Sequence, residues 1–228
     1  MSRIILVSTI VLITSCYWNN DKQTNLQPVT GKPDSLKIVS DISPPPGFKR
    51  MTVTKNSFGE WLRGIAIKKD RHVYLYNGSL KRNQRAQFVV LDISVGNKDL
   101  QQCADAMMRL RAEYLFSQKE YNQIAFRDNA GKYYKWTGGA NRQDFDKYLE
   151  KVFAMCGSAS LEKQLHPVAF EDMQPGDVLI RGGFPGHAMI VIDMAIDANG
   201  NKLFMLAQSY MPAQDIHIHR SGFFQPAS

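Results

Sequence analysis

Cysteine is scarce in this sequence, with three residues in 228, and this excludes a small domain held together by a disulfide framework. No run of 18 apolar residues is present, which excludes an ordinary membrane-spanning helix. The 16 glycines and 10 prolines are too few for a collagen-like or low-complexity chain. Charged residues form no long run of one sign, and 44% of the chain is apolar, so wholesale disorder is excluded as well. The remaining class is a globular protein with one substantial core or two small ones.

The first residues have the composition of an export signal. Arg3 precedes an uncharged, mostly apolar run from Ile4 to Ile13, and small residues follow before Cys16. A cation, a short apolar run and small residues are typical of a secretory signal. A cysteine directly after Ile-Thr-Ser resembles the bacterial lipobox, where the thiol is acylated and the chain is cut just before it. We predict a lipoprotein signal peptide at residues 1–15 and a lipid anchor on Cys16. The alternative is an ordinary signal peptide, with Cys16 incidental.

A flexible tether is predicted to follow the signal. Residues 16–43 are rich in Asn, Gln, Thr, Ser and Asp, with little apolar periodicity. Three prolines and Gly47 then lead into the single predicted domain, residues 44–228. Tyr17, and not the aspartate linked to inner-membrane retention, follows Cys16, and this favours an outer membrane location facing the periplasm or the cell surface. The predicted partner is therefore a membrane, reached through the lipid anchor.

The net charge of +7 is carried by 28 basic and 21 acidic residues. Cleavage before Cys16 removes Arg3 and leaves 27 − 21 = +6. The basic residues are scattered among acidic ones and no nucleic-acid-binding motif is present, so no nucleic-acid partner is expected. Attraction to an anionic cell-wall polymer or lipid is a better use of this charge, and solubility is the alternative.

The pattern of apolar residues predicts helices before a sheet. Ser57 and Glu60 fit a capping box for a first helix. The other expected helices span 100–117, with Asp99 as N-cap, and 142–156, which Gly157 ends; strands are expected at 71–76, 86–94, 178–181, 187–196 and 202–208. The last two strands are apolar on both faces, and Asn199-Gly200 between them signals a hairpin. The predicted class is α+β, with N-terminal helices packed on a mostly antiparallel sheet.

Cys103 is a candidate nucleophile because it lies in the first turn of a predicted helix. The unpaired amides and the dipole at a helix N-terminus favour an anion, lower a thiol's pKa and can hold an oxyanion. The alternatives are a small buried apolar residue on the helix's apolar stripe, or a disulfide with Cys156, which an exported protein permits.

His187 begins an apolar strand and could present its ring to a cleft, although a lone histidine at this position is more often a packing residue. Gln208 ends the next strand. Loops of two or four residues around Asn199-Gly200 would place both side chains on one face, whereas an odd loop length would separate them. Gln208 is therefore a candidate group to orient the His187 ring, and a polar strand end is the alternative.

His217 and His219 lie two residues apart in the C-terminal segment and could bind zinc with Asp215 or His187. A solvated face of a strand is the favoured interpretation, because ligand-rich spacing is missing elsewhere. No metal is therefore assigned.

Three stretches resemble an uncharacterised family of exported domains common among Bacteroidetes-type lipoproteins, a domain of unknown function. They run from Val73 to Gly78, from Asp99 to Leu115, and from Pro175 to Asp193 together with Ala207 to His217. More distantly, the layout is similar to NlpC-like, papain-fold cysteine peptidases and amidases. The nucleophile motif here is Gln-Cys-Ala-Asp and not the usual Asp-Cys-Ser-Gly, and the interval between cysteine and histidine is longer than usual.

The resemblance to the peptidases implies a papain-like fold and a Cys103–His187–Gln208 triad. Cys103 would attack an amide carbonyl, His187 would move the proton and Gln208 would orient His187, while Tyr76 would assist the oxyanion. The implied function is that of a cell-envelope cysteine hydrolase, a peptidase or amidase, which acts on an amide, for instance in peptidoglycan, without a cofactor. The alternative is a non-catalytic envelope binding or scaffold lipoprotein on the same fold.

Overall fold

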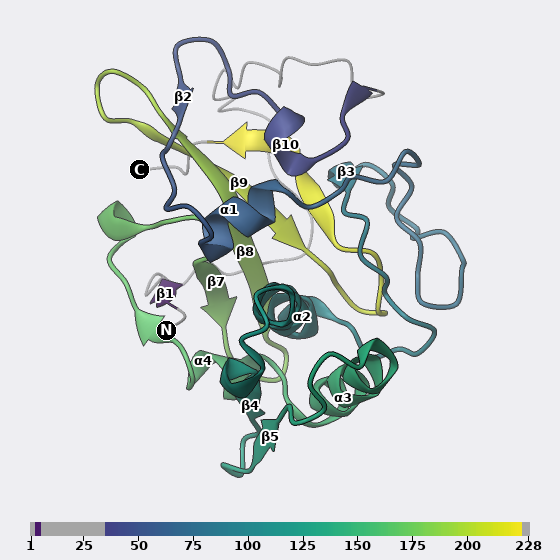
Figure 1. Ribbon diagram of the computed structural model, residues 1–228. Helices are drawn as coiled ribbons and strands as arrows, with labels where there is room; N and C mark the ends of the chain where they lie inside the picture. Colours follow the sequence, from purple (N-terminus) through teal and green to yellow (C-terminus); the bar gives the residue numbers. More distant parts are fainter. Residues whose placement is uncertain (1–2, 6–34, 225–228) are drawn as a thin grey trace.

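The computed structural model describes residues 3–5 and 35–224 (Figure 1). One sheet with the strand order β3-β10-β9-β8-β7-β1-β6 dominates the fold, and β2 pairs with β8 off this path. Its strands are β1 (Arg3–Ile5), β2 (Lys49–Arg50), β3 (Gln87–Val90), β6 (His166–Pro167), β7 (Val178–Arg181), β8 (His187–Ile196), β9 (Lys202–Gln208) and β10 (His217–Phe224). The pairing is antiparallel except at β1, which runs parallel to β6 and β7. A small separate sheet joins β4 (Ala125–Arg127) to β5 (Tyr133–Lys135).

Within the described residues, four α-helices accompany the sheet: α1 (Phe58–Arg63), α2 (Cys103–Ser117), α3 (Arg142–Met155) and α4 (Ser158–Glu162). Short 3-10 turns lie at Val39–Asp41, Tyr121–Gln123 and Phe170–Asp172. The α+β class and the mostly antiparallel sheet are as predicted. The predicted N-terminal layer of helices is wrong, because β2 and β3 precede α2, and β4 and β5 separate α2 from α3. The physical reason is long-range pairing, in which Val90 of β3 lies opposite His217 of β10.

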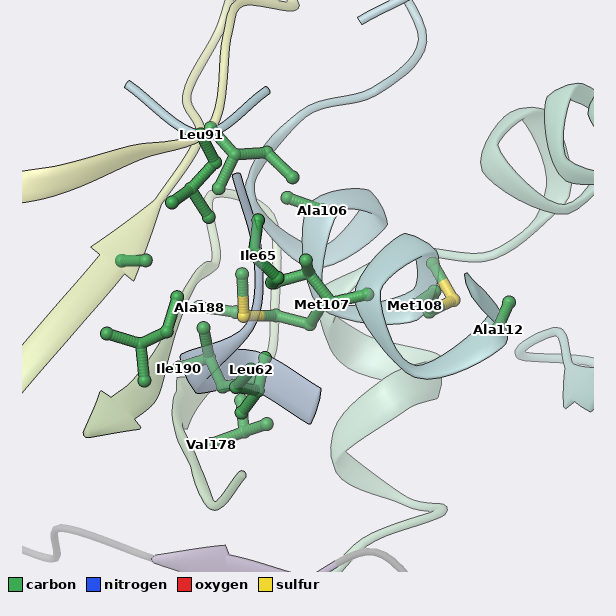
Figure 2. Packing of buried hydrophobic residues seen from close by; sticks show 14 of the residues in the cluster. Leu62, Ile65, Leu91, Ala106, Met107, Met108, Ala112, Val178, Ala188 and Ile190 are labelled. Atoms are coloured by element: carbon green, nitrogen blue, oxygen red, sulfur yellow. The ribbon is translucent and has the colours of Figure 1, made fainter. Parts of the chain in front are cut away.

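Helix α2 is the centre of the core. It contacts β8 on one side and α1, α3 and α4 on others, so that ten of its fifteen residues are buried (Figure 1). Figure 2 shows Met107 of α2 among Ala188 and Ile190 of β8 and Leu62 of α1. All four side chains are less than 4% exposed, and each large one contributes roughly 1.5–3 kcal/mol through its burial. The packing of α2 on β8 fixes the start of the helix beside the start of the strand.

The chain before residue 44 belongs partly to the fold. Val39 and Ile42 are fully buried, and the Val39 amide donates to the Ile65 carbonyl at 3.0 Å. The predicted boundary at residue 44 is therefore too late, because the apolar residues Leu36, Ile38, Val39 and Ile42 do not alternate as in a strand and are too few to indicate a helix. Cys16 lies outside the described residues, as do residues 6–34, which hold most of the predicted signal and tether. Among the described helices, none is long and apolar enough to cross a membrane.

The predicted strand at 71–76 does not form. Tyr74 and Leu75 make only isolated bridges, to Leu80 and Gln214. The side-chain amide of Gln84 instead bonds both the N–H and the carbonyl of Val73, at 3.0 and 2.9 Å. A side chain thus satisfies the backbone groups that a neighbouring strand would otherwise pair.

Candidate active site

Cys103 is the first residue of α2, and not the fourth as the sequence suggested. Gln102 precedes the helix, and its backbone N–H donates to Oδ2 of Asp105 at 3.0 Å. The predicted cap, Asp99, is used elsewhere, since its Oδ1 accepts from the Ala213 amide at 2.7 Å. At the start of the helix, the backbone N–H groups of Cys103 and Ala104 have no acceptor in a preceding helical turn.

The thiol of Cys103 lies against the backbone amides of Ala188 and Ala104. Burial is the largest influence and raises the pKa of this thiol, while the two amides act to lower it. The residue is 9% exposed. The expected net lowering of the thiol pKa by the helix N-terminus is therefore reversed, because desolvation outweighs the amide dipoles. The resting group is a neutral thiol that needs a base.

His187 is the first residue of β8 and is half-buried. Its Nε2 lies 2.9 Å from Oε1 of Gln208 at the end of β9. An amide oxygen can only accept, so Nε2 carries the proton in the neutral ring and Nδ1 is a free acceptor. Nδ1 is buried and has no hydrogen-bond partner among the described residues. Burial lowers the pKa of His187, so the ring is a neutral base at neutral pH.

A β-bulge sets the register that joins these two side chains. The loop between β8 and β9 holds three residues, 198–200, since Asp197 and Asn201 still pair across it. Both predicted loop lengths, two and four residues, are therefore wrong. A three-residue loop in a regular hairpin would place His187 and Gln208 on opposite faces of the sheet. Between Val191 and Asp193 the register shifts, with Ile192 as the extra residue on β8. The extra residue reverses the alternation and returns both side chains to one face.

Cys103 lines a cleft of about 320 Å³ between the start of α2, the end of α3 and the loop before β8. The lining residues are Asp99, Leu100, Gln102, Cys103, Ala104, Asp105, Phe153, Ala154, Cys156, Gly157, Ser158, Gly183, Phe184, Pro185, Gly186 and Met211. This volume lies at the lower end of the range of small-ligand sites, which is roughly 300–1,000 Å³. The cleft can hold a small acyl group against the thiol.

Tyr76 does not line this cleft. It is half-buried, and its backbone N–H donates to the Ala213 carbonyl at 2.9 Å. The structure places the Ala188 amide, next to His187, against the Cys103 thiol and pairs His187 with Gln208, while Tyr76 lies outside the cleft. The amides of Cys103 and Ala104, which lie against the thiol, are the remaining candidates for binding an oxyanion.

Asp105 is a site residue that sequence reasoning missed. The residue lines the cleft and is only 6% exposed, and its buried Oδ1 has no partner in the part of the chain that the structure describes. Burial raises the pKa of Asp105 to about 8. The available signal was the acidic residue two positions after Cys103, in the Gln-Cys-Ala-Asp motif.

Cys156, the C-cap of α3, is a free thiol, as is Cys103, and both line the same cleft. Burial raises the pKa of Cys156 to about 11. Of the two thiols, only Cys103 has a backbone amide of the His187 strand against it.

The histidines of β10 serve the fold. His217 is fully buried with Nδ1 3.1 Å from the Asp215 carbonyl, and burial lowers the pKa of His217 to about 4. The Asp215 carboxylate binds Lys68 at 2.8 Å and the Tyr74 amide at 3.0 Å. Within the described ranges, no group of three or more His, Cys, Asp or Glu side chains could hold a metal ion.

Comparison with known proteins gives a family but no activity. The chain belongs to the family described as domain of unknown function 4846, whose model matches residues 38–142 and 129–222. No curated protein and no solved structure matches the chain.

Proposed function

We propose that this protein is a lipid-anchored cysteine hydrolase of the cell envelope, which cleaves an amide through Cys103, His187 and Gln208. One observation carries the proposal. The amide oxygen of Gln208 accepts a hydrogen bond from Nε2 of His187 at 2.9 Å, and Nδ1 of His187 has no partner among the described residues. The backbone amide of the next residue, Ala188, lies against the Cys103 thiol. The order of Cys103, His187 and Gln208 along the chain resembles the layout of NlpC-like, papain-fold peptidases and amidases, and this resemblance supports the same assignment.

The first half of the reaction acylates the enzyme. Cys103 Sγ attacks the carbonyl carbon, and the thiol proton passes to Nδ1 of His187. The amides of Cys103 and Ala104 stabilise the oxyanion at the start of α2. The C–N bond then breaks, and the leaving amine takes the proton from the imidazolium, so a thioester and a free amine result.

The second half returns the thiol. His187 takes a proton from water, the hydroxide adds to the thioester carbonyl, and the C–S bond breaks. The carboxylic acid leaves, and Cys103 recovers its proton from His187. Gln208 accepts a hydrogen bond from the Nε2–H throughout, which keeps Nδ1 directed at the sulfur and the reacting proton. No metal or organic cofactor takes part in this scheme.

The substrate and location form part of the proposal. An export signal and an acylated Cys16 would hold the domain on the outer membrane, facing the periplasm or the surface, within reach of peptidoglycan stem peptides or another envelope amide. Cleavage before Cys16 would also remove β1, so that β7 would lose the strand on its outer side.

The alternative is a binding or scaffold lipoprotein with an inert thiol, and the low exposure of Cys103 and its raised pKa favour it. Alkylation separates the two functions. In a Cys156→Ser background, iodoacetamide should modify native Cys103, and His187→Ala should slow this by about tenfold or more because the base is lost. Protection of Cys103 until urea unfolds the protein would support the inert scaffold and overturn the hydrolase.

A further inference from the structure

The rim of the cleft exposes large apolar side chains. Phe184 is 90% exposed and Met211 is 50% exposed, and both line the cleft. Tyr210 is also half-exposed, and its ring packs edge-on against the His187 ring, with 5.3 Å between the ring centroids. Exposed apolar groups gathered at a concave site are typical of a binding surface.

The exposure of Phe184 does not come from a loosely held loop. The Gly182 amide donates to the Glu162 carboxylate at 2.9 Å, and the Ser158 hydroxyl donates to the Gly183 carbonyl at 3.2 Å. Gly186 is packed so closely that a Cβ there would lie 2.0 Å from Ser158 Oγ. The fold thus fixes the loop on both sides of Phe184 and presents its ring to solvent.

The charges at the cleft do not suit an acidic ligand. Its lining residues include no Lys, Arg or His, and the acidic ones are Asp99 and Asp105. Asp99 is bound by the Ala213 amide, and Asp105 is buried. Arg181 lies opposite His187 on β7 and is exposed, but it does not line the cleft.

The position of the thiol decides which part of the substrate occupies the cleft. Cys103 lines it and His187 does not. The acyl group becomes bonded to the sulfur, whereas the leaving amine takes its proton from His187. The acyl side of the substrate therefore lies beside Phe184 and Met211.

We propose that the cleft selects peptides in which the residue on the acyl side of the cleaved amide has a large, uncharged, apolar side chain, packed on Phe184 and Met211. This inference rests on the proposed cysteine hydrolase, and it narrows the substrate to neutral, apolar peptide segments.

Three peptidyl chloromethyl ketones test the inference, identical except for Leu, Glu or Lys next to the reactive carbon. The measurement is the rate of adduct formation at Cys103 in the full chain, by intact mass and peptide mapping, with iodoacetamide as a side-chain-free reference. We expect the Leu probe to react about tenfold faster than the Glu and Lys probes, as an apolar subsite typically discriminates. Equal or faster reaction of the Glu or Lys probe would overturn the inference.

Variants assign the preference to the rim. Phe184→Ser and Met211→Ser should each lower the ratio of the Leu rate to the iodoacetamide rate several-fold, and Phe184→Leu should restore most of it. Leu80→Ser removes another exposed apolar side chain, 54% exposed and away from the cleft, and should leave this ratio unchanged.

An unchanged ratio in both rim variants would also overturn the inference. If iodoacetamide leaves native Cys103 unmodified, the hydrolase itself fails. Alkylation without probe preference rejects only the apolar subsite.

Discussion

The amide oxygen of Gln208, the last residue of β9, lies 2.9 Å from Nε2 of His187, the first residue of β8. This contact fixes which ring nitrogen carries the proton, and therefore which nitrogen is free to act as a base.

Removal of the Gln208 amide should change the pH dependence of Cys103 alkylation. The hydrogen bond that the His187 Nε2–H donates to Gln208 raises the pKa of His187 and opposes the lowering caused by burial. In Gln208→Ala the pKa of His187 should fall further, so the acid limb of the rate profile should move to lower pH. The rate itself should fall about tenfold or more because the ring loses its orientation. Gln118→Ala, on the exposed end of α2, serves as control, and a Gln208→Ala profile that is lower but unshifted would contradict the orienting role.

Asp105 should make the protein less stable as the pH rises. Its pKa is about 8 in the folded state against 3.8 for the unperturbed group, so the folded protein retains a proton that the unfolded chain has lost. This contribution to the free energy of unfolding is complete below pH 3.8 and is lost as the pH rises through 8. Asp105→Asn cannot ionise, so its stability should decline less than that of the wild type between pH 6.5 and 8.

Urea unfolding at several pH values between 6.5 and 8 compares the free energies of unfolding of Asp105→Asn and the wild type. This window lies above the lower pH range in which His187 and His217 also titrate. Asp92→Asn, at an exposed carboxylate, should follow the wild-type curve. Parallel curves for Asp105→Asn and the wild type would show that Asp105 is ionised in the folded protein.

Asp193 should be essential for stability. It is fully buried and binds Arg50 at 2.5 Å and Arg63 at 2.7 Å, thereby joining the N-terminal segment and α1 to β8. Asp193→Asn removes the charge but leaves both cations, and should lower the free energy of unfolding by about 3 kcal/mol. Urea titration measures the loss. The control, Asp172→Asn, changes an exposed carboxylate and should stay within about 0.5 kcal/mol of the wild type.

Gly186 should tolerate no side chain. A Cβ there would lie 2.0 Å from Ser158 Oγ and 2.8 Å from the carbonyl oxygens of Arg181 and Gly183. Gly186→Ala must displace the loop that precedes His187, so it should lower stability by about 1–3 kcal/mol and also slow Cys103 alkylation. Gly157→Ala is the matched control at the same cleft, where a Cβ meets no atom within 4 Å. Normal alkylation in Gly186→Ala would show that the loop does not position His187.

Cys16 should carry the lipid. Cells given an alkyne-tagged fatty acid should label the wild-type protein and not the Cys16→Ser variant, which should still be exported but should leave the membrane fraction. Equal labelling of both proteins would contradict the anchor, and absence of both from the envelope would contradict export.

The central strands could be read from the sequence because their signal is local. β7, β8 and β9 begin and end where the apolar runs and their glycine boundaries predict, and α3 ends one residue earlier than predicted. The start of α2 could not be predicted, because Asp99 caps the distant Ala213 amide in place of its own helix. The cleft around Cys103 was equally hidden, since Phe184 and Met211 meet there only after the chain has folded. The sequence also predicted that His187 and Gln208 form a pair. That prediction assumed a loop of two or four residues, whereas the structure has three.

The extra residue at Ile192 divides the β8–β9 hairpin into two halves with separate phases. The half next to the turn holds Asp193, which binds Arg50 and Arg63. The half beyond the bulge holds the imidazole of His187 and the amide of Gln208. A change of one residue in the turn would therefore separate His187 and Gln208, unless loss of the bulge cancels it. Family members with a two-residue turn and a regular strand would present the same pair. The quantity to compare between family members is whether the turn and bulge residues together are even or odd in number, and not the length of the turn alone.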